Sequence, residues 1–360
     1  MQKLSFQNFL VNFFFWAFLF TTILAIRYYD IGNIAFINQD IKIPLIRIFG
    51  NGPMIGLLVA IPYTLAEAYL KDKGLYHNSL GRIILNRTLY LFIISSLVLL
   101  VVAYLNYQLD LVSNIIDISE IGFGDYVFSA TVGFMFAGAL FGNIILTLFR
   151  TLQSKIGDEE LNVILAGKYR PPLEVRRAFM FLDLQASTTI AEELGHQTYS
   201  HFIQDCFKDL HTALVATDAT VYQYVGDEAV LTWPSEIATK GNNFIEAYFI
   251  FQNKLDSRKA YYEEKYGIAP FFKAGVNIGS VMAAEVGIDK REIAYHGDVL
   301  NTAARIQSLC NKYEASLLCS EMVVNNMWNV DNYEITEKEE LLLRGKTRMI
   351  KVFEVKRKLG

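Results

Sequence analysis

The chain has 360 residues, 52% of them hydrophobic and only 19% charged, which is too apolar for one ordinary soluble domain. Charge is concentrated late in the chain: 17 of the first 150 residues are charged, against 53 of the last 210. The first part therefore suits a lipid environment and the second part suits water.

A net charge of -4 and the lack of a basic cluster argue against nucleic acid as a partner. Cys206, Cys310 and Cys319 show no CxxC spacing, which predicts free thiols and no zinc site.

Four apolar runs in the first part are long enough to cross a bilayer, which takes roughly 20 helical residues. They lie at about residues 6–26, 52–70, 85–105 and 126–149. The first run is longer than the roughly 7 to 15 apolar residues of a cleaved signal peptide. We therefore predict that residues 1–149 form a helical membrane bundle of four spans.

The loops between these runs predict an orientation. The loop after the second run holds four basic residues, Lys71, Lys73, Arg82 and Arg87. The loop after the third run carries four carboxylates and no lysine or arginine. Because basic loops stay inside, the former is expected in the cytoplasm. An even number of spans then places both termini there, in a multi-pass protein of the cell (inner) membrane.

Glu67 is a charged residue inside the second apolar run. Such a residue favours either of two interpretations. The bundle could be a packed anchor, or a sensor in which Glu67 faces an interior cavity. The sequence leaves both open, because no ligand-binding pattern accompanies Glu67.

Residues 150–174 form a linker between the two parts. Their apolar residues recur at a rough helical spacing, as Leu152, Ile156, Leu161 and Ile164. Pro171 and Pro172 then stop the helix. The stripe could pair with a second copy as a dimerisation helix, or pack on the polar domain. The polar domain itself is predicted over residues 175–360.

Two aspartates of this domain lie where strands are expected to end. Asp183 closes a buried strand, and Asp227 lies at the tip of a predicted hairpin. A helix follows the first strand, and its N-terminal N–H groups suit a phosphate; it begins with Ser187, Thr188 and Thr189. If the two strands are neighbours, the carboxylates could share two divalent cations, as two-metal phosphoryl chemistry requires. Taken alone, either aspartate is more typical of a turn or cap.

Asn301 and Arg305 lie four residues apart in a predicted helix and therefore share one face. An amide and a guanidinium so placed can hold a ribose and a phosphoryl group in transfer. Taken in isolation, the pair is more typical of a solvated polar stripe.

In this order, the motifs resemble the catalytic domain of the class III nucleotidyl cyclases. The similar segments span about residues 168–356 and read FLDLQASTTIAEELG, VGDEAVLTW, FKAGVNIGSVMAAEVG, GDVLNTAARI and LLLRGKTRMIKVFEV. The resemblance implies an α+β ferredoxin-like domain that works as a homodimer, with active sites completed by both subunits. It also implies ATP, or GTP, as the substrate.

The resemblance further implies site roles, position by position. Asp183 and Asp227 match the aspartates that bind two Mg²⁺ or Mn²⁺ ions, and Leu184 matches a position whose carbonyl also binds metal. Asn301 matches the asparagine that orients the ribose, and Arg305 the arginine that stabilises the transition state. Lys346 matches a lysine that holds the terminal phosphates. These matches predict an adenylate cyclase that forms cyclic AMP and pyrophosphate.

The chain departs from the family at the positions that read the base. Gln223 stands where a lysine is usual, and Ala294 stands where an aspartate or threonine is usual. Gln223 still offers an amide to a purine edge, but the Ala294 side chain offers nothing. ATP is preferred over GTP here on family frequency alone. A guanylate cyclase, or a catalytically silent membrane module with a cyclase fold, remains the alternative.

Overall fold

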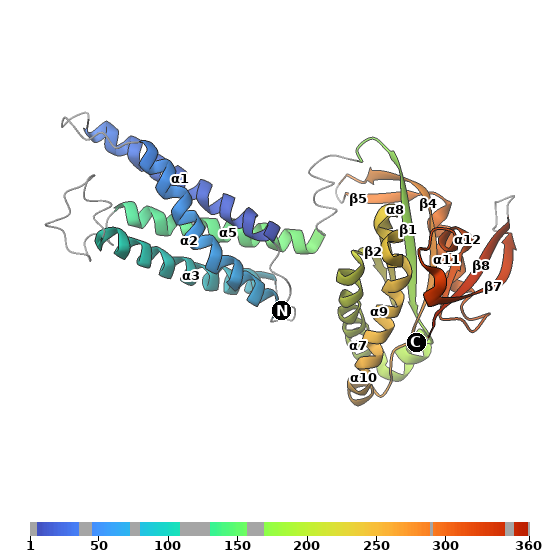
Figure 1. Ribbon diagram of the computed structural model, residues 1–360. Helices are drawn as coiled ribbons and strands as arrows, with labels where there is room; N and C mark the ends of the chain where they lie inside the picture. Colours follow the sequence, from blue (N-terminus) through green and yellow to red (C-terminus); the bar gives the residue numbers. More distant parts are fainter. Residues whose placement is uncertain are drawn as a thin grey trace. The chain divides into compact units, whose positions relative to one another are not determined.

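The computed structural model describes residues 6–35, 45–72, 80–108, 130–156, 169–288, 291–342 and 349–358 (Figure 1). The chain divides into two compact units, Met1–Ile156 and Gly157–Gly360. Of the predicted linker, residues 150–174, the stretch 157–168 lies outside the described residues, so the dimerisation helix stays a prediction.

The first unit contains four long helices within its described residues: α1 (Phe6–Ala35), α2 (Leu45–Asp72), α3 (Leu80–Gln108) and α5 (Ala130–Ile156). Each holds a segment apolar and long enough to cross a membrane: Asn8–Ile26, Phe49–Tyr69, Ile84–Leu105 and Gly133–Thr151. Four candidate membrane helices are therefore confirmed. Large apolar side chains such as Phe18 and Leu97 stay exposed on them, as lipid-facing positions require.

Close packing within this unit depends on small residues. A Cβ added at Gly56 of α2 would lie 2.4 Å from the backbone nitrogen of Ala17 in α1. The two helices therefore approach backbone to backbone, as small residues permit in membrane bundles. Trp16 and Tyr63 fill the adjoining core, with ring centroids 5.5 Å apart.

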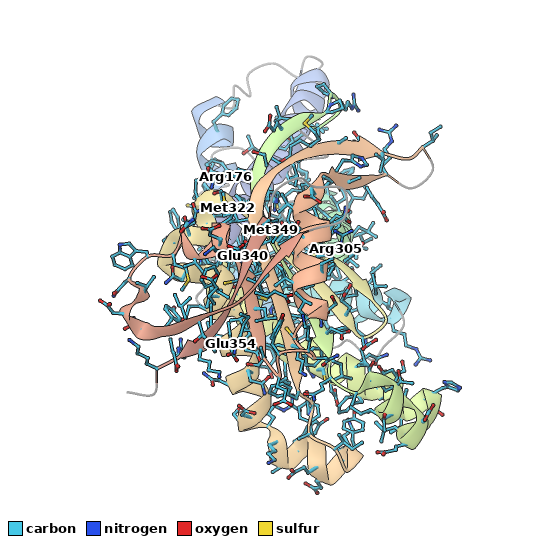
Figure 2. The ribbon with its side chains drawn as sticks, turned by 90° about the vertical axis from the view of Figure 1, so that its right-hand side faces the viewer. Arg176, Arg305, Met322, Glu340, Met349 and Glu354 are labelled. Atoms are coloured by element: carbon cyan, nitrogen blue, oxygen red, sulfur yellow. The ribbon has the colours of Figure 1, made fainter. Side chains whose placement is uncertain are left out.

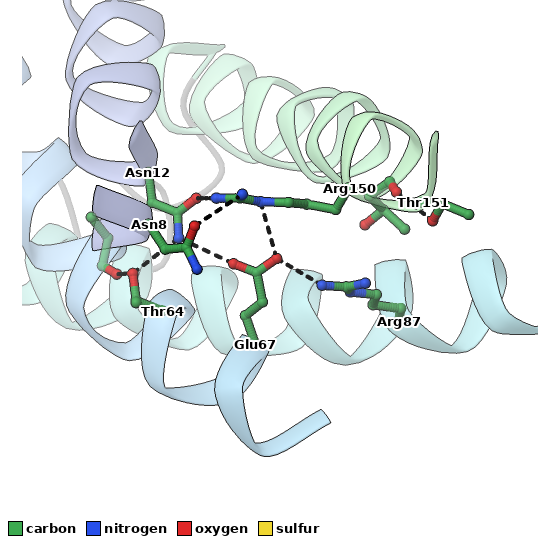
Figure 3. Close-up of polar contacts among 9 residues, drawn as sticks. Asn8, Asn12, Thr64, Glu67, Arg87, Arg150 and Thr151 are labelled. Atoms are coloured by element: carbon green, nitrogen blue, oxygen red, sulfur yellow. Dashed lines mark hydrogen bonds and ion pairs between the residues drawn. The ribbon is translucent and has the colours of Figure 1, made fainter. Parts of the chain in front are cut away.

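Glu67 is buried and is bonded to all three other helices (Figure 3). Its Oε1 accepts a hydrogen bond from Arg87 of α3 at 2.7 Å and lies 3.4 Å from Nε of Arg150 in α5. Its Oε2 accepts from Nδ2 of Asn12 in α1 at 3.3 Å. Arg150 also donates to Asn8 and Asn12 of α1 at 3.2 and 3.4 Å. We call Asn8, Asn12, Thr64, Glu67, Arg87 and Arg150 the polar node; it shows that Glu67 lies in an ion-pair network.

The second unit is built on one mixed sheet with helices on both faces (Figure 1). Its described strands are β1 (Leu173–Leu184), β2 (Thr220–Val225), β3 (Glu228–Pro234), β4 (Phe272–Val286), β5 (Glu292–His296), β6 (Leu317–Ser320), β7 (Tyr333–Leu342) and β8 (Met349–Arg357). They are ordered β2-β3-β1-β4-β6-β8-β7, and β5 pairs with β4. All pairs are antiparallel except β4 with β6.

The helices of this unit are α7 (Ser187–Thr217), α9 (Asn243–Ser257), α10 (Lys259–Tyr266) and α11 (Asp298–Ser308), with short α8 (Ser235–Thr239) and α12 (Glu321–Val324). Two 3₁₀ turns span Lys240–Asn242 and Val330–Asn332. The sequence β1-α7-β2-β3-α9-β4 is the predicted ferredoxin-like core. The α+β fold class is thereby confirmed.

Alternation along β1 separates the two sides of the sheet. Met180 and Leu182 face a core formed with α7 and α9, whereas Phe179 and Phe181 pack with residues of α11. Asp183 has the parity of the second set. The sheet therefore presents Asp183 on the side that carries α11.

A carboxylate on α7 anchors α10. Asp205 accepts hydrogen bonds from Tyr261, Lys265 and Tyr266 at 2.7, 2.8 and 2.6 Å. Burial alone would raise the pKa of Asp205, but these three donors outweigh it and lower the pKa to about 2. The folded protein therefore favours the ionised carboxylate more than the unfolded chain does.

We expect Asp205→Asn to lower the free energy of unfolding at pH 7 by about 2 kcal/mol. Because the folded pKa lies below the ordinary 3.8, this contribution is fully present above about pH 4. It is lost as the pH falls toward 2. Denaturant unfolding of wild type and variant at several pH values checks this. A stability difference that stays constant from pH 5 down to pH 2 would contradict it.

Candidate active site

Asp183 is the penultimate residue of β1 and lies between two neighbouring strands. Its register partners are Glu228 at the start of β3 and Lys273 on β4. The Lys273 ammonium donates to Oδ1 of Asn311 at 2.8 Å. The carboxylate of Asp183 accepts a hydrogen bond from Gln307 of α11, with Nε2 3.3 Å from Oδ2.

Asp227 occupies the two-residue turn between β2 and β3, where Val225 pairs with Glu228. Gly226, the first turn residue, has a φ of +63°, which suits a tight hairpin and favours glycine. Since β3 pairs directly with β1, this turn lies beside the end of β1. Oδ2 of Asp227 is buried and has no hydrogen-bond partner among the described residues. Such an acceptor favours a partner outside the described residues, such as water or a cation, because leaving it unsatisfied is costly.

The strand register brings the two aspartates close together, because Asp183 pairs with Glu228, the residue that follows Asp227. Burial, followed by the nearby charge of Asp227, raises the pKa of Asp183, while the Gln307 hydrogen bond opposes the rise. Burial also raises the pKa of Glu228, and both aspartates add to that rise. Crowded carboxylates of this kind are relieved by a cation.

The donor set fits a hard divalent ion. Asp183 and Asp227 supply carboxylate oxygens, the ligands that Mg²⁺ and Mn²⁺ prefer. Across the described residues, no group of three or more His, Cys, Asp or Glu side chains is arranged to hold a metal. Part of the coordination shell would therefore come from backbone, water or substrate, as is usual for Mg²⁺.

The N-terminus of α7 adjoins the two aspartates. Ala186, just before the helix, has a left-handed backbone (φ 57°), and no side chain caps the first turn. Ser187 is partly buried, whereas Thr188 and Thr189 are exposed. A hydrogen bond joins Ser187 to Tyr199, whose pKa is raised to about 12 by burial and then by Asp227. The uncapped first turn thus lies near Asp227, since Tyr199 is affected by both.

Asn301 and Arg305 lie on the outer side of α11. The helix buries Val299, Thr302, Ala303 and Ile306 against the sheet, while Asn301 is exposed and Arg305 is partly exposed. Figure 2 looks onto this side of the sheet, with Arg305 on the helix. No described residue forms an ion pair with the Arg305 guanidinium. A cation in this position is available for an external anion.

The two predicted base-reading positions lie on β2 and β5. Gln223 is exposed and follows a bulge in the pairing of β2 with β3, and Ala294 pairs with Ala284 of β4. Their neighbours Tyr222 and Tyr295 have ring centroids 5.3 Å apart. The two strands therefore approach each other near these positions. Lys346 lies outside the described residues, between β7 and β8.

Residues 175–355, half of the chain, match the family model described as the adenylate and guanylate cyclase catalytic domain. The chain belongs to this family. It is 31% identical over 186 residues to adenylate cyclase 2 of Rhizobium meliloti (strain 1021), covering 52% of this chain and 51% of that protein. It is 24% identical over 190 residues to an adenylate cyclase of Anabaena cylindrica, covering 50% of this chain and 37% of that protein. The chain thus spans about half or less of these relatives.

A solved bacterial light-regulated adenylyl cyclase shares the cyclase fold, with a TM-score of 0.51 and 18% identity. The alignment covers 59% of this chain and 61% of that structure. At this identity the likeness concerns the fold.

In this cyclase domain, the structure brings together Asp183, Asp227 and the first turn of α7. It places Asn301 and Arg305 elsewhere, on the outer side of α11. The sequence interpretation missed Gln307 and Glu228. Glu228 directly follows the hairpin aspartate in the VGDEAV motif, which could have drawn attention to it. For Gln307 the sequence held no comparable signal.

Proposed function

We propose that this protein is a membrane-anchored adenylate cyclase, which converts ATP to cyclic AMP and pyrophosphate. The observation that carries the proposal is the convergence of Asp183 and Asp227 beside the uncapped first turn of α7. A pair of crowded carboxylates next to free N–H groups suits a cation-bound polyphosphate. The named adenylate cyclases among the relatives support ATP as the substrate.

The geometry of α11 supports a homodimer with shared sites. At about 100° per residue, Arg305 lies roughly 160° around the helix from Gln307, the residue that contacts Asp183. Asn301 and Arg305 therefore point away from the aspartates of their own chain. For all four residues to contact the same nucleotide, the aspartates would have to come from one copy of the chain, and Asn301 and Arg305 from another. A symmetric dimer would contain two such sites.

In this reaction, the 3′-hydroxyl of the ribose attacks the α-phosphorus in line, and pyrophosphate leaves. Asp183 and Asp227, with the carbonyl of Leu184, would hold two Mg²⁺ or Mn²⁺ ions. When bound, these ions supply positive charge that favours ionisation of the 3′-hydroxyl and stabilises the leaving group.

The remaining residues bind and orient the nucleotide. The N–H groups from Ser187 to Thr189 would bind phosphate oxygens at the helix N-terminus. Asn301 would orient the ribose through its amide. Arg305 and Lys346 would offset the negative charge that develops on the transferring phosphoryl group and the leaving pyrophosphate.

Base selection rests on fewer groups than is usual in the family. The exposed amide of Gln223 can donate to or accept from a purine edge, whereas Ala294 offers only its backbone. A site with one hydrogen-bonding side chain discriminates less than a site with two. We therefore propose a preference for ATP that is weaker than in a cyclase with both groups. The four membrane helices would hold the enzyme at the inner membrane with both termini and the catalytic domain in the cytoplasm.

The test is product formation by the purified full chain with Mg²⁺ or Mn²⁺ and either ATP or GTP. We expect cyclic AMP and pyrophosphate in equal amounts, a lower rate with GTP, and no product after metal removal with EDTA. Faster formation of cyclic GMP from GTP would reassign the enzyme as a guanylate cyclase. No product from either nucleotide, with the fold intact, would favour a silent membrane module.

A further inference from the structure

Gln307 is the only described residue whose side chain donates a hydrogen bond to Asp183, with Nε2 3.3 Å from Oδ2. We propose that Gln307 is a positioning residue, which fixes the Asp183 carboxylate in the orientation that binds the divalent ions. The inference rests on the proposed function, because it assigns Asp183 to the metal site. It adds a residue from α11 to the half-site formed by β1 and the β2–β3 turn.

The fold places Gln307 there through a close contact between α11 and β4. A Cβ added at Gly275 would lie 2.2 Å from the backbone nitrogen of Gln307. Gly275 pairs with Phe181 of β1, two residues before Asp183. Because glycine lets the last turn of α11 approach the sheet this closely, the Gln307 side chain can reach across to β1. A second glycine, Gly279, similarly admits Val299 at the start of the helix.

The chemistry of an amide suits this position. Gln307 donates a hydrogen bond without carrying a charge, so it orients Oδ2 while leaving the negative charge of the pair for cations. A lysine or arginine would neutralise the carboxylates and compete with metal. The nearest candidate by register, Lys273, donates instead to Asn311. A glutamate would add a fourth negative charge to those of the two aspartates and Glu228.

Side chains that hydrogen-bond to a metal ligand tune metal affinity, and their removal typically weakens metal binding or activity 10–100-fold. We expect Gln307→Met, which keeps the length of the side chain but removes the donor, to weaken Mn²⁺ binding on the order of ten-fold. Gln307→Asn keeps the amide but is one methylene too short, so it should weaken binding similarly. Turnover at limiting metal should fall in parallel and recover at high Mn²⁺.

The experiment measures Mn²⁺ binding by electron paramagnetic resonance of the free ion. It uses the full chain with 2′,3′-dideoxy-ATP, which lacks the attacking hydroxyl, so binding is read without turnover. Gln252→Met is the matched control, because Gln252 on α9 donates to Asp256 at 3.2 Å in a solvent-exposed pair. Asp227→Ala is the reference for loss of the metal site.

Wild-type Mn²⁺ affinity in Gln307→Met or in Gln307→Asn would overturn the proposal. Failure of both variants to fold would also overturn it, since Gln307 would then be a packing residue. Unchanged Mn²⁺ binding in Asp227→Ala would instead refute the proposed metal site itself. The two failures are therefore distinguishable.

Discussion

Asp227→Ala is expected to reduce cyclic AMP formation by at least about 1000-fold while leaving the protein folded. A cation at a phosphoryl-transfer site is worth several kcal/mol, and each 1.4 kcal/mol is about ten-fold in rate. Asp227 lies in a turn at the edge of the domain, and no described residue depends on its Oδ2 for a hydrogen bond. Its loss should therefore affect the chemistry and not the core. Initial rates with ATP and Mn²⁺ measure the loss of activity, and the thermal unfolding midpoint measures whether the fold is kept.

A mixing experiment extends this prediction to the dimer. Arg305→Ala should also be inactive alone, because it removes the charge on the outer face of α11. In a mixed dimer of the two variants, one site carries both defects and the other carries neither. Since half of randomly mixed dimers are of this kind, activity should return to roughly a quarter of the wild-type level.

Asp256→Ala, on an exposed part of α9, is the control for the aspartate substitution. Activity near the wild-type rate in Asp227→Ala would remove the basis of the proposed function. Two inactive variants that stay inactive when mixed, although they exchange subunits, would rule out sites shared between copies.

Glu67→Gln is expected to destabilise the membrane unit by about 3–5 kcal/mol, the range for breaking a buried ion pair. Glu67 is the carboxylate that contacts both Arg87 and Arg150, and the three side chains are 11–19% exposed. Removing its charge leaves two neighbouring guanidinium groups without their shared counter-ion in a low-dielectric setting. The measurement is detergent-induced unfolding of the full chain, followed by circular dichroism.

A double variant tests whether charge is the cause. Glu67→Gln with Arg87→Gln removes one charge of each sign, so part of the lost stability should return. Leu65→Ala, an exposed position on the same helix, is the control and should have little effect. Equal destabilisation by the single and double variants would show that the loss comes from packing and not from the ion pairs.

The sequence predicted the residues that belong to ordered motifs. Asp183 and Asp227 could be assigned to strand ends because alternation and a Gly-Asp turn are local patterns. Gln307 could not be found in this way. Its contact with Asp183 depends on a glycine more than thirty residues away on β4, which lets the helix approach the sheet.

The membrane unit shows the same limit. The sequence predicts Arg87 as a loop charge that sets orientation, and it leaves open a cavity beside Glu67. Both lie inside helices and bond to each other at 2.7 Å, an arrangement between segments twenty residues apart. Hydrophobic runs reveal the number of helices but not which helix ends meet. The pairing of buried polar groups could therefore be known only from the tertiary structure.

The two sides of α11 have a consequence for regulation. In the proposed dimer, the outer side of this helix would serve one nucleotide, while Gln307 on its flank holds the aspartate that serves the other. Any rotation of the helix as the first pocket fills would be transmitted to the metal ligands of the second. The two active sites would then be coupled through α11, a helix of 11 residues. Nucleotide binding at one active site would change the cation affinity of the other.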